Sequence, residues 1–240
     1  LRALELDEAL AEAHTAIGQV KLNFDWDWHG AERAWRRALE LNPNSVDALR
    51  LSTEHLIWTG QFEEGLAQVR RARDLDPLAR LVNLELGYAY LRTRRYDEAI
   101  AQYRRMLELD PNFSQGRFHL AWLYTFKGMH AEALAEYKKL GEPPDNARLG
   151  FLYAKMGRRD DARRVADNLR RLSTQQYVSA YTVAILYAGL GDKDQAFAWL
   201  DKAYQERSTL VAQLKVEAFF DPLRSDPRFQ NLLRRMNFPQ

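Results

Sequence analysis

The feature that most constrains this chain is a helix-ending sequence, Leu-Asp-Pro or Leu-Asn-Pro, that recurs at a fixed interval. Pro43, Pro77 and Pro111 are spaced 34 residues apart. Proline has no backbone N–H and disfavours a helical conformation in the residue before it, so each proline ends one unit and suits the start of the next. The interval holds two helices and a turn. The spacing therefore predicts an array of antiparallel helix pairs, none of which can bury its apolar faces alone.

Residues 80–113 are the clearest copy of this unit. Gly87 and Ala99 are small enough to let the two helices approach closely, while Leu86, Tyr90 and Tyr103 fill the space around them. This pattern resembles the tetratricopeptide repeat (TPR), a 34-residue helix-turn-helix unit. The resemblance implies an all-α fold, a right-handed TPR superhelix (α-solenoid) of about six helix-turn-helix repeats with a C-terminal capping helix.

The phase of the repeat predicts where each unit begins and ends. Residues 1–10 match the end of a truncated preceding repeat, so we expect the chain to come from the interior of a longer polypeptide. Within the last segment, Leu210–Ala218 is expected to form one more first helix, Phe219–Pro227 two Asp-Pro turns, and Arg228–Met236 a last short helix. The predicted repeats within 11–207 are 11–45, 46–79, 80–113, 114–142, 143–176 and 177–207, followed by a capping segment at 208–240.

Composition excludes several classes of function. Among the 240 residues, 35 are basic and 33 acidic, and the formal net charge of +2 creates no strong field for nucleic acid or anionic lipid. There is no cysteine, which excludes disulfides and cysteine-ligated metals. No apolar run approaches the ~20 residues of a membrane span. We therefore predict no direct nucleic-acid binding and no membrane insertion.

Catalytic signatures are also absent from the sequence. The five histidines never form a close pair at metal-ligand spacing, and there is no Gly-x-Gly-x-x-Gly run, P-loop or Gly-x-Ser-x-Gly elbow. We predict that the segment is not an enzyme and has no catalytic residue, no metal and no cofactor.

The informative surface is the inner one, formed by the first helices of the repeats. In the early units its positions are mixed or polar, as at Thr15, Gln19 and Glu54, a pattern unlike that of TPR domains that bind acidic chaperone C-termini. From the third unit on these positions become apolar, which would exceed the few hundred Å² that a monomer leaves exposed. The predicted partner-binding groove consists of Leu84, Tyr88, Leu91, Phe118, Trp122, Phe126, Phe151, Tyr181 and Ile185.

Three occupants of this groove compete. A partner helix or extended peptide could bind there through the aromatic residues. Alternatively, the chain's own C-terminal helix, with Phe229, Leu232 and Leu233, could fold back and fill it, or a second copy could cover it as a homodimer. In the first turn, Trp26 and Trp28 either stiffen the end of the array or stack on a ligand or partner.

A narrower resemblance concerns the first turn and the tail. Asp25-Trp26-Asp27-Trp28, and the segment from Phe220 to Phe229, look like the C-terminal TPR arrays of large bacterial signalling proteins. Those arrays are joined to winged-helix DNA-binding, protein kinase or adenylate cyclase modules. The resemblance implies a cytoplasmic sensory or partner-binding part of a regulator in signal transduction or transcription. It leaves open a protein or peptide partner, docking on upstream domains of the same chain, and homodimerisation.

Overall fold

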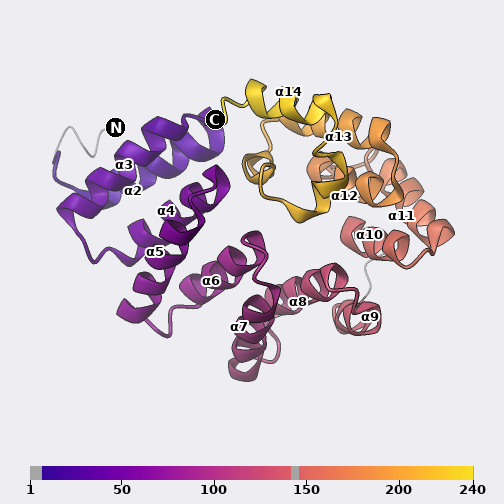
Figure 1. The fold of residues 1–240 in the computed structure, drawn as a ribbon, viewed down its shortest axis with the longest axis horizontal. Helices are drawn as coiled ribbons and strands as arrows, with labels where there is room; N and C mark the ends of the chain where they lie inside the picture. Colours follow the sequence, from indigo (N-terminus) through magenta and orange to yellow (C-terminus); the bar gives the residue numbers. More distant parts are fainter. Residues whose placement is uncertain (1–6, 142–145, 240) are drawn as a thin grey trace. The chain divides into compact units, whose positions relative to one another are not determined.

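The computed structural model describes residues 7–141 and 146–239, and within these ranges every regular element is helical (Figure 1). This confirms the predicted all-α class. The α-helices run in the order α2 (Ala11–Val20), α3 (Trp28–Leu41), α4 (Val46–Thr59), α5 (Phe62–Leu75), α6 (Arg80–Arg92), α7 (Tyr96–Leu109), α8 (Ser114–Phe126), α9 (His130–Lys139), α10 (Ala147–Lys155), α11 (Arg159–Leu172), α12 (Ala180–Leu190), α13 (Lys193–Gln205) and α14 (Pro227–Arg235). A π-helical turn, η1 (Lys21–Asp25), follows α2, and two 3₁₀ segments, η2 (Thr209–Gln213) and η3 (Ala218–Leu223), follow α13.

The helices divide into two compact units, and the C-terminal segment contributes to both. Unit 1 contains the chain up to Gln102 together with residues 212–216 and the end of the chain from Leu233. Unit 2 contains residues 103–211 and 217–232. The predicted boundary between residues 142 and 143 and most of the predicted leading segment 1–10 lie outside the described residues.

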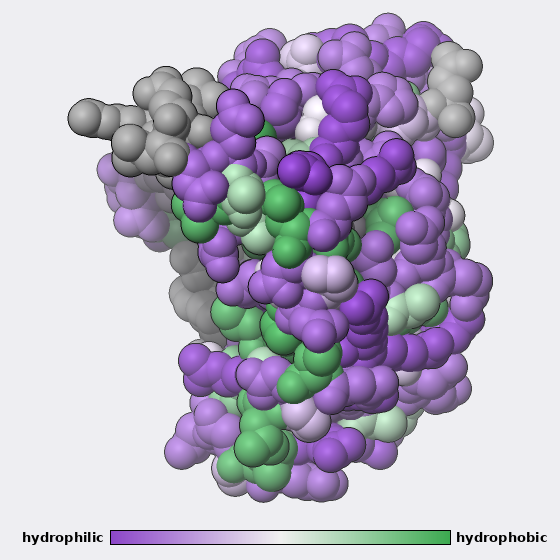
Figure 2. Space-filling model, turned by 90° about the vertical axis from the view of Figure 1, so that its left-hand side faces the viewer, coloured by the Kyte–Doolittle hydropathy of each residue, from purple (hydrophilic) through white to green (hydrophobic). Residues whose placement is uncertain are grey.

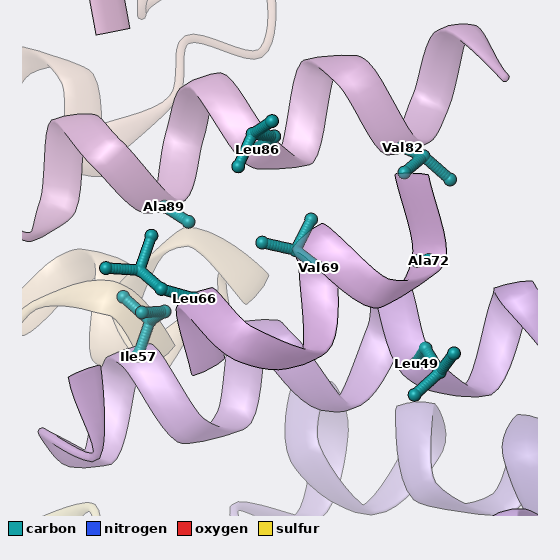
Figure 3. Packing of buried hydrophobic residues seen from close by; sticks show 8 residues of the cluster. All are labelled: Leu49, Ile57, Leu66, Val69, Ala72, Val82, Leu86 and Ala89. Atoms are coloured by element: carbon teal, nitrogen blue, oxygen red, sulfur yellow. The ribbon is translucent and has the colours of Figure 1, made fainter. Parts of the chain in front are cut away.

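Local signals explain where the helices of unit 1 begin and end. The hydroxyl of Ser45 accepts a hydrogen bond from the backbone N–H of Ala48 and caps the start of α4. Gly60, with a φ of 101°, ends the same helix in the left-handed conformation that glycine adopts without strain. Figure 3 shows the core that results, in which side chains of α5 lie between those of α4 and α6. Its members are Leu49, Ile57, Leu66, Val69, Ala72, Val82, Leu86 and Ala89.

Unit 2 is built in the same way around α10, α11 and α12. Gly150 lies at a close approach of α10 to α12, since a Cβ added there would meet Leu186 Cδ1 at 2.7 Å. The helix α9 has 10 residues, whereas α5 and α7 have 14, which accounts for the shortened fourth repeat. The buried core around these helices comprises Ala147, Ala162, Val165, Ala166, Leu169, Val183 and Leu186.

The predicted helix at Leu210–Ala218 is wrong, whereas the last short helix is confirmed as α14. The segment forms η2, turns and the start of η3 instead. Four consecutive residues, Val211 to Leu214, are all buried. A surface helix buries only one of its faces, whereas all four of these residues are buried, so tertiary packing overrides the local helix propensity. Pro222 likewise lies inside η3 rather than in an open turn.

One face of the molecule is largely hydrophilic (Figure 2). Figure 2 shows a face on which hydrophilic residues predominate and hydrophobic residues are exposed in smaller areas between them. Within residues 7–141 and 146–239, no helix combines the length and apolar character that crossing a membrane requires.

Candidate partner-binding surface

The predicted groove residues of unit 1 lie on α6 and are mostly buried. Leu84 is 8% exposed and Leu91 is 1% exposed. Tyr88 is half-buried, and the guanidinium carbon of Arg92 lies 5.6 Å from the centre of its ring. The inner surface of unit 1 is therefore not an open apolar groove.

Charged side chains of α4 and α6 lie close to one another in unit 1. We define the charged cluster as Arg50, Glu54, Glu85 and Arg92, contributed by α4 and α6. Burial raises the pKa of the Glu85 carboxyl well above its ordinary value, and the nearby charge of Glu54 raises it further, against the opposing effect of the two arginines. Burial likewise raises the pKa of Glu54.

The C-terminal segment closes over the charged cluster. Arg92, which is buried, donates a hydrogen bond to the side-chain oxygen of Gln213, which is also buried. The ammonium of Lys215 donates to the backbone oxygens of Thr59 and Pro239, each at 3.2 Å. Polar contacts thus attach residues 212–216 to unit 1.

The end of the chain packs against the first turn of unit 1. The indole N–H of Trp28 donates to the backbone oxygen of Met236 at 2.8 Å, and its ring stacks on Phe238 with centroids 4.3 Å apart. Trp26 and Trp28 are 3% and 2% exposed. The burial of both tryptophans and the contacts of Trp28 support the interpretation that these side chains stiffen the end of the array.

In unit 2 the predicted groove residues come together from α8, α10 and α12. Phe118 packs edge-on against Trp122 at 5.1 Å, and Phe126 packs against Phe151 at 6.4 Å. Tyr181 and Ile185 are fully buried. We define the aromatic pocket as the three side chains Trp122, Phe126 and Phe151.

Phe219 of η3 fills the aromatic pocket. Its ring centre lies 5.5 Å from that of Trp122, 4.7 Å from Phe126 and 4.8 Å from Phe151. The contacts with Trp122 and Phe151 are edge-to-face, with interplanar angles of 80° and 85°, a favourable geometry for aromatic pairs. The adjacent Phe220 packs edge-on against Tyr181 at 5.2 Å. The surface is therefore covered by the chain itself.

Arg148 adds a cation to the pocket. Its guanidinium carbon lies 4.1 Å from the ring centre of Trp122, 5.5 Å from Phe118 and 5.7 Å from Phe219. Cation–π attraction of this kind favours aromatic side chains over aliphatic ones of similar size.

The helix after η3 fixes the segment on unit 2. Arg228 at the start of α14 forms an ion pair with Asp194 of α13 at 2.7 Å, and its guanidinium lies 4.3 Å from the ring centre of Phe197. Phe229 and Leu232, expected to fill the groove if the chain folded back, are buried, whereas Leu233 is only half-buried. The chain does fold back, but Phe219 and Phe220 make the ring contacts with the predicted groove residues.

One cavity of unit 1 is lined by a buried histidine. A cavity of about 360 Å³ lies between α3, α4 and α5, with His55 and Trp35 among its lining residues. Burial lowers the pKa of His55 to about 4, so its imidazole is neutral at neutral pH. Among the described residues, no group of three or more histidine, aspartate or glutamate side chains could hold a metal ion.

Comparison with known proteins identifies this architecture. The family model of the tetratricopeptide repeat matches residues 59–112, which contain α5, α6 and α7. The fold is that of a tetratricopeptide-repeat array. No match was found among curated proteins.

Solved structures extend the likeness to nearly the whole chain. A tetratricopeptide repeat protein from Parabacteroides merdae is 16% identical and superposes with a TM-score of 0.69, covering 98% of this chain and 89% of its own. PilW, a type IV pilus biogenesis factor, is 15% identical with a TM-score of 0.58 and coverages of 93% and 98%. Pseudomonas aeruginosa PilF is 19% identical with a TM-score of 0.57 and coverages of 95% and 98%. At these identities, the likeness establishes the fold alone.

Three residues that carry this surface were missed at the sequence level. The sequence pattern predicts a turn at Phe219 and Phe220, and nothing in it distinguishes Arg148. In repeat arrays the first-helix surface is the one commonly used for binding. The one available signal was the pair of adjacent phenylalanines in a segment where the repeat pattern is lost, because such a pair needs apolar partners elsewhere.

Proposed function

We propose that this array is a non-catalytic protein-interaction scaffold that binds a partner peptide or helix on the inner surface of unit 2, at the predicted groove residues Phe118, Trp122, Phe126, Phe151, Tyr181 and Ile185. The fold supports a scaffold, because stacked helix pairs present extended surfaces for protein contacts. The observation that carries the proposal is Phe219 in the aromatic pocket: this surface already holds a short segment that does not belong to the repeats.

The wider role that we propose is regulatory. The resemblance of the first turn and the tail to arrays of bacterial signalling proteins supports a cytoplasmic sensory part of a larger regulator of transcription or another output. In that role the array transmits the presence of a partner to a domain that performs the reaction.

A second candidate is an intramolecular regulatory domain. It is favoured by the fact that the predicted groove of unit 2 is occupied by the same chain, through Phe219 and Phe220. In this case the natural ligand of the array is part of its own polypeptide, such as an upstream kinase or cyclase module, and a homodimer is the third arrangement.

Peptide display tests the proposal. Peptides selected on the immobilised chain should bind it in solution, measured by fluorescence anisotropy, and Trp122→Ala should weaken binding by about 2 kcal/mol, roughly thirtyfold. Tyr177→Ala is the matched control, because Tyr177 is an aromatic residue that is 74% exposed. Peptides that bind equally to the folded Trp122→Ala variant would refute binding at this surface.

A further inference from the structure

The aromatic pocket of unit 2 has a definite chemical preference that its present occupant reveals. We propose that it recognises a partner segment with two adjacent aromatic residues, and that Phe219-Phe220 is a built-in competitor for that segment. This inference rests on the proposed function and names the partner's chemistry.

The repeat fold does not require an aromatic pocket. One repeat earlier, the position of Trp122 is occupied by Tyr88, and two repeats earlier by Glu54. The position of Phe126 is occupied by Arg92 one repeat earlier. Because earlier repeats fold with Glu54 and Arg92 at these positions, the repeat itself does not require aromatic residues there, and we assign the rings of α8 to a contact.

The pocket fits a ring rather than apolar surface in general. Phe219 is 1% exposed and meets two of the three pocket rings edge-on. Such pairs contribute beyond the area they bury. Arg148, with its cation over Trp122 and near Phe219, adds attraction to an aromatic occupant that an aliphatic side chain would not gain.

The second ring has its own place. Phe220 is fully buried and packs edge-on against Tyr181 of α12, whereas Phe219 packs against α8 and α10. Two consecutive residues thus enter two neighbouring sites. A partner that makes both contacts needs two adjacent aromatic side chains, as in the tail itself.

The two residues that follow the rings, Asp221 and Pro222, are exposed, whereas the next residue, Leu223, is buried. The carboxylate of Asp221 accepts a hydrogen bond at 2.7 Å from Arg224, within the same segment. The requirement for binding is therefore the ring pair, with few constraints on the two residues directly after it.

Competition from the tail sets the affinity for a partner. A tethered segment acts at a high effective concentration, in the millimolar range for short flexible links, so an external segment binds the intact protein weakly. Weakening the tail's own contacts should raise the affinity for a partner without any change in the pocket.

The experiment uses a fluorescein-labelled peptide of residues 214–225 as an external partner of the full chain. Its binding is measured by fluorescence anisotropy to wild type and to Phe219→Ala/Phe220→Ala. We expect the double variant to bind the peptide at least about tenfold more tightly than wild type. Adding Arg148→Ala to the double variant should weaken binding again.

Control peptides test the chemistry of the ring pair. A peptide with both phenylalanines replaced by alanine should not bind, and one with both replaced by leucine should bind more weakly than the native peptide. Equal binding of the three peptides, or no binding of the native peptide to a folded double variant, would overturn the inference. A dimer of the double variant, seen by light scattering without peptide binding, would assign the pocket to a second copy instead.

Two further measurements keep the test decisive. If circular dichroism shows that the double variant is unfolded, Phe219→Leu replaces it, with a smaller gain in affinity expected. Displayed peptides that lack adjacent aromatic residues, yet lose binding to the Trp122→Ala variant, would refute this inference and leave the proposed scaffold function intact. If Trp122→Ala weakens the binding of no displayed peptide, the result counts against the scaffold function itself.

Discussion

The inner surfaces of the two units are closed by the same C-terminal segment through opposite chemistry. In unit 1 the contact is polar and joins Arg92 of the charged cluster to Gln213. In unit 2 the contact is aromatic and places Phe219 among the rings of the aromatic pocket. The helix-pair framework is common to both, so the residues of the inner surface are free to vary without loss of the fold.

This difference determines what each surface responds to. The stability that buried charged groups contribute depends on pH and on a complete set of hydrogen-bonding and ionic partners, because an unsatisfied buried charge is costly. The stability that buried aromatic rings contribute depends on the area and shape of the contact and hardly on pH. Unit 1 should therefore be sensitive to protonation and unit 2 to truncation of side chains.

Truncation of the aromatic contact should have the largest effect. Phe219→Ala removes a ring that is almost fully buried and leaves a cavity, so we expect it to lower the free energy of unfolding by about 3 to 5 kcal/mol. Chemical denaturation followed by circular dichroism measures this change. Tyr177→Ala, at a residue that is 74% exposed, should change it by less than about 0.5 kcal/mol. Similar small effects of both variants would contradict the account of unit 2.

Protonation of His55 should have the next largest effect, and it belongs to unit 1. Burial lowers the pKa of His55 to about 4 from the ordinary value of 6.5. Since the unfolded chain takes up the proton first, stability is fully present above the ordinary pKa and is lost as the pH falls through this window. The loss between pH 7 and pH 4 should be about 3 kcal/mol greater in wild type than in His55→Gln. A loss of equal size in the two proteins would contradict this assignment to His55.

Removal of the polar contact should have a smaller effect than removal of the aromatic one. Gln213→Leu leaves the buried Arg92 without that acceptor, which we expect to cost about 1.5 to 3 kcal/mol. Chemical denaturation at pH 7 measures this loss in the free energy of unfolding, for comparison with the loss caused by Phe219→Ala. A loss from Gln213→Leu larger than that from Phe219→Ala would reverse the ranking of the two contacts.

Glu85 of unit 1 should make stability depend on pH in the direction opposite to His55. Burial, helped by Glu54, raises its pKa well above the ordinary value, so the unfolded chain loses this proton first as the pH rises. The stability that the protonated carboxyl contributes is therefore present at low pH and is lost as the pH rises through the folded-state pKa. Glu85→Gln should flatten this decline at pH values above the ordinary pKa of 4.5, measured as the slope of stability against pH. An unchanged slope would show that Glu85 does not titrate in this range.

Most of the fold could be predicted from the sequence because its signals are local. The three prolines at equal spacing and the glycines between helices mark where elements end, and Gly60, for example, has the positive φ that this role requires. The buried side of each helix follows from the same phase. These signals depend only on neighbouring residues, so a single sequence reveals them.

The candidate site could be predicted only in part. The aromatic residues of α8, α10 and α12 were found because the repeat places them on one surface. Their occupant was not, because Phe219 meets Trp122 and Phe151 across a long separation in sequence, and no local pattern records that contact. The helix expected at Leu210–Ala218 failed for the same reason.

The sequence by itself determined the repeat, its phase and the positions that face inward, since these follow from proline spacing, helix ends and the helical period. Only the tertiary structure decided the conformation of residues 209–223 and which side chains enter the aromatic pocket. That decision comes from burial: residues 211–214 are buried in succession, and burying them stabilises the fold more than completing a helix there would.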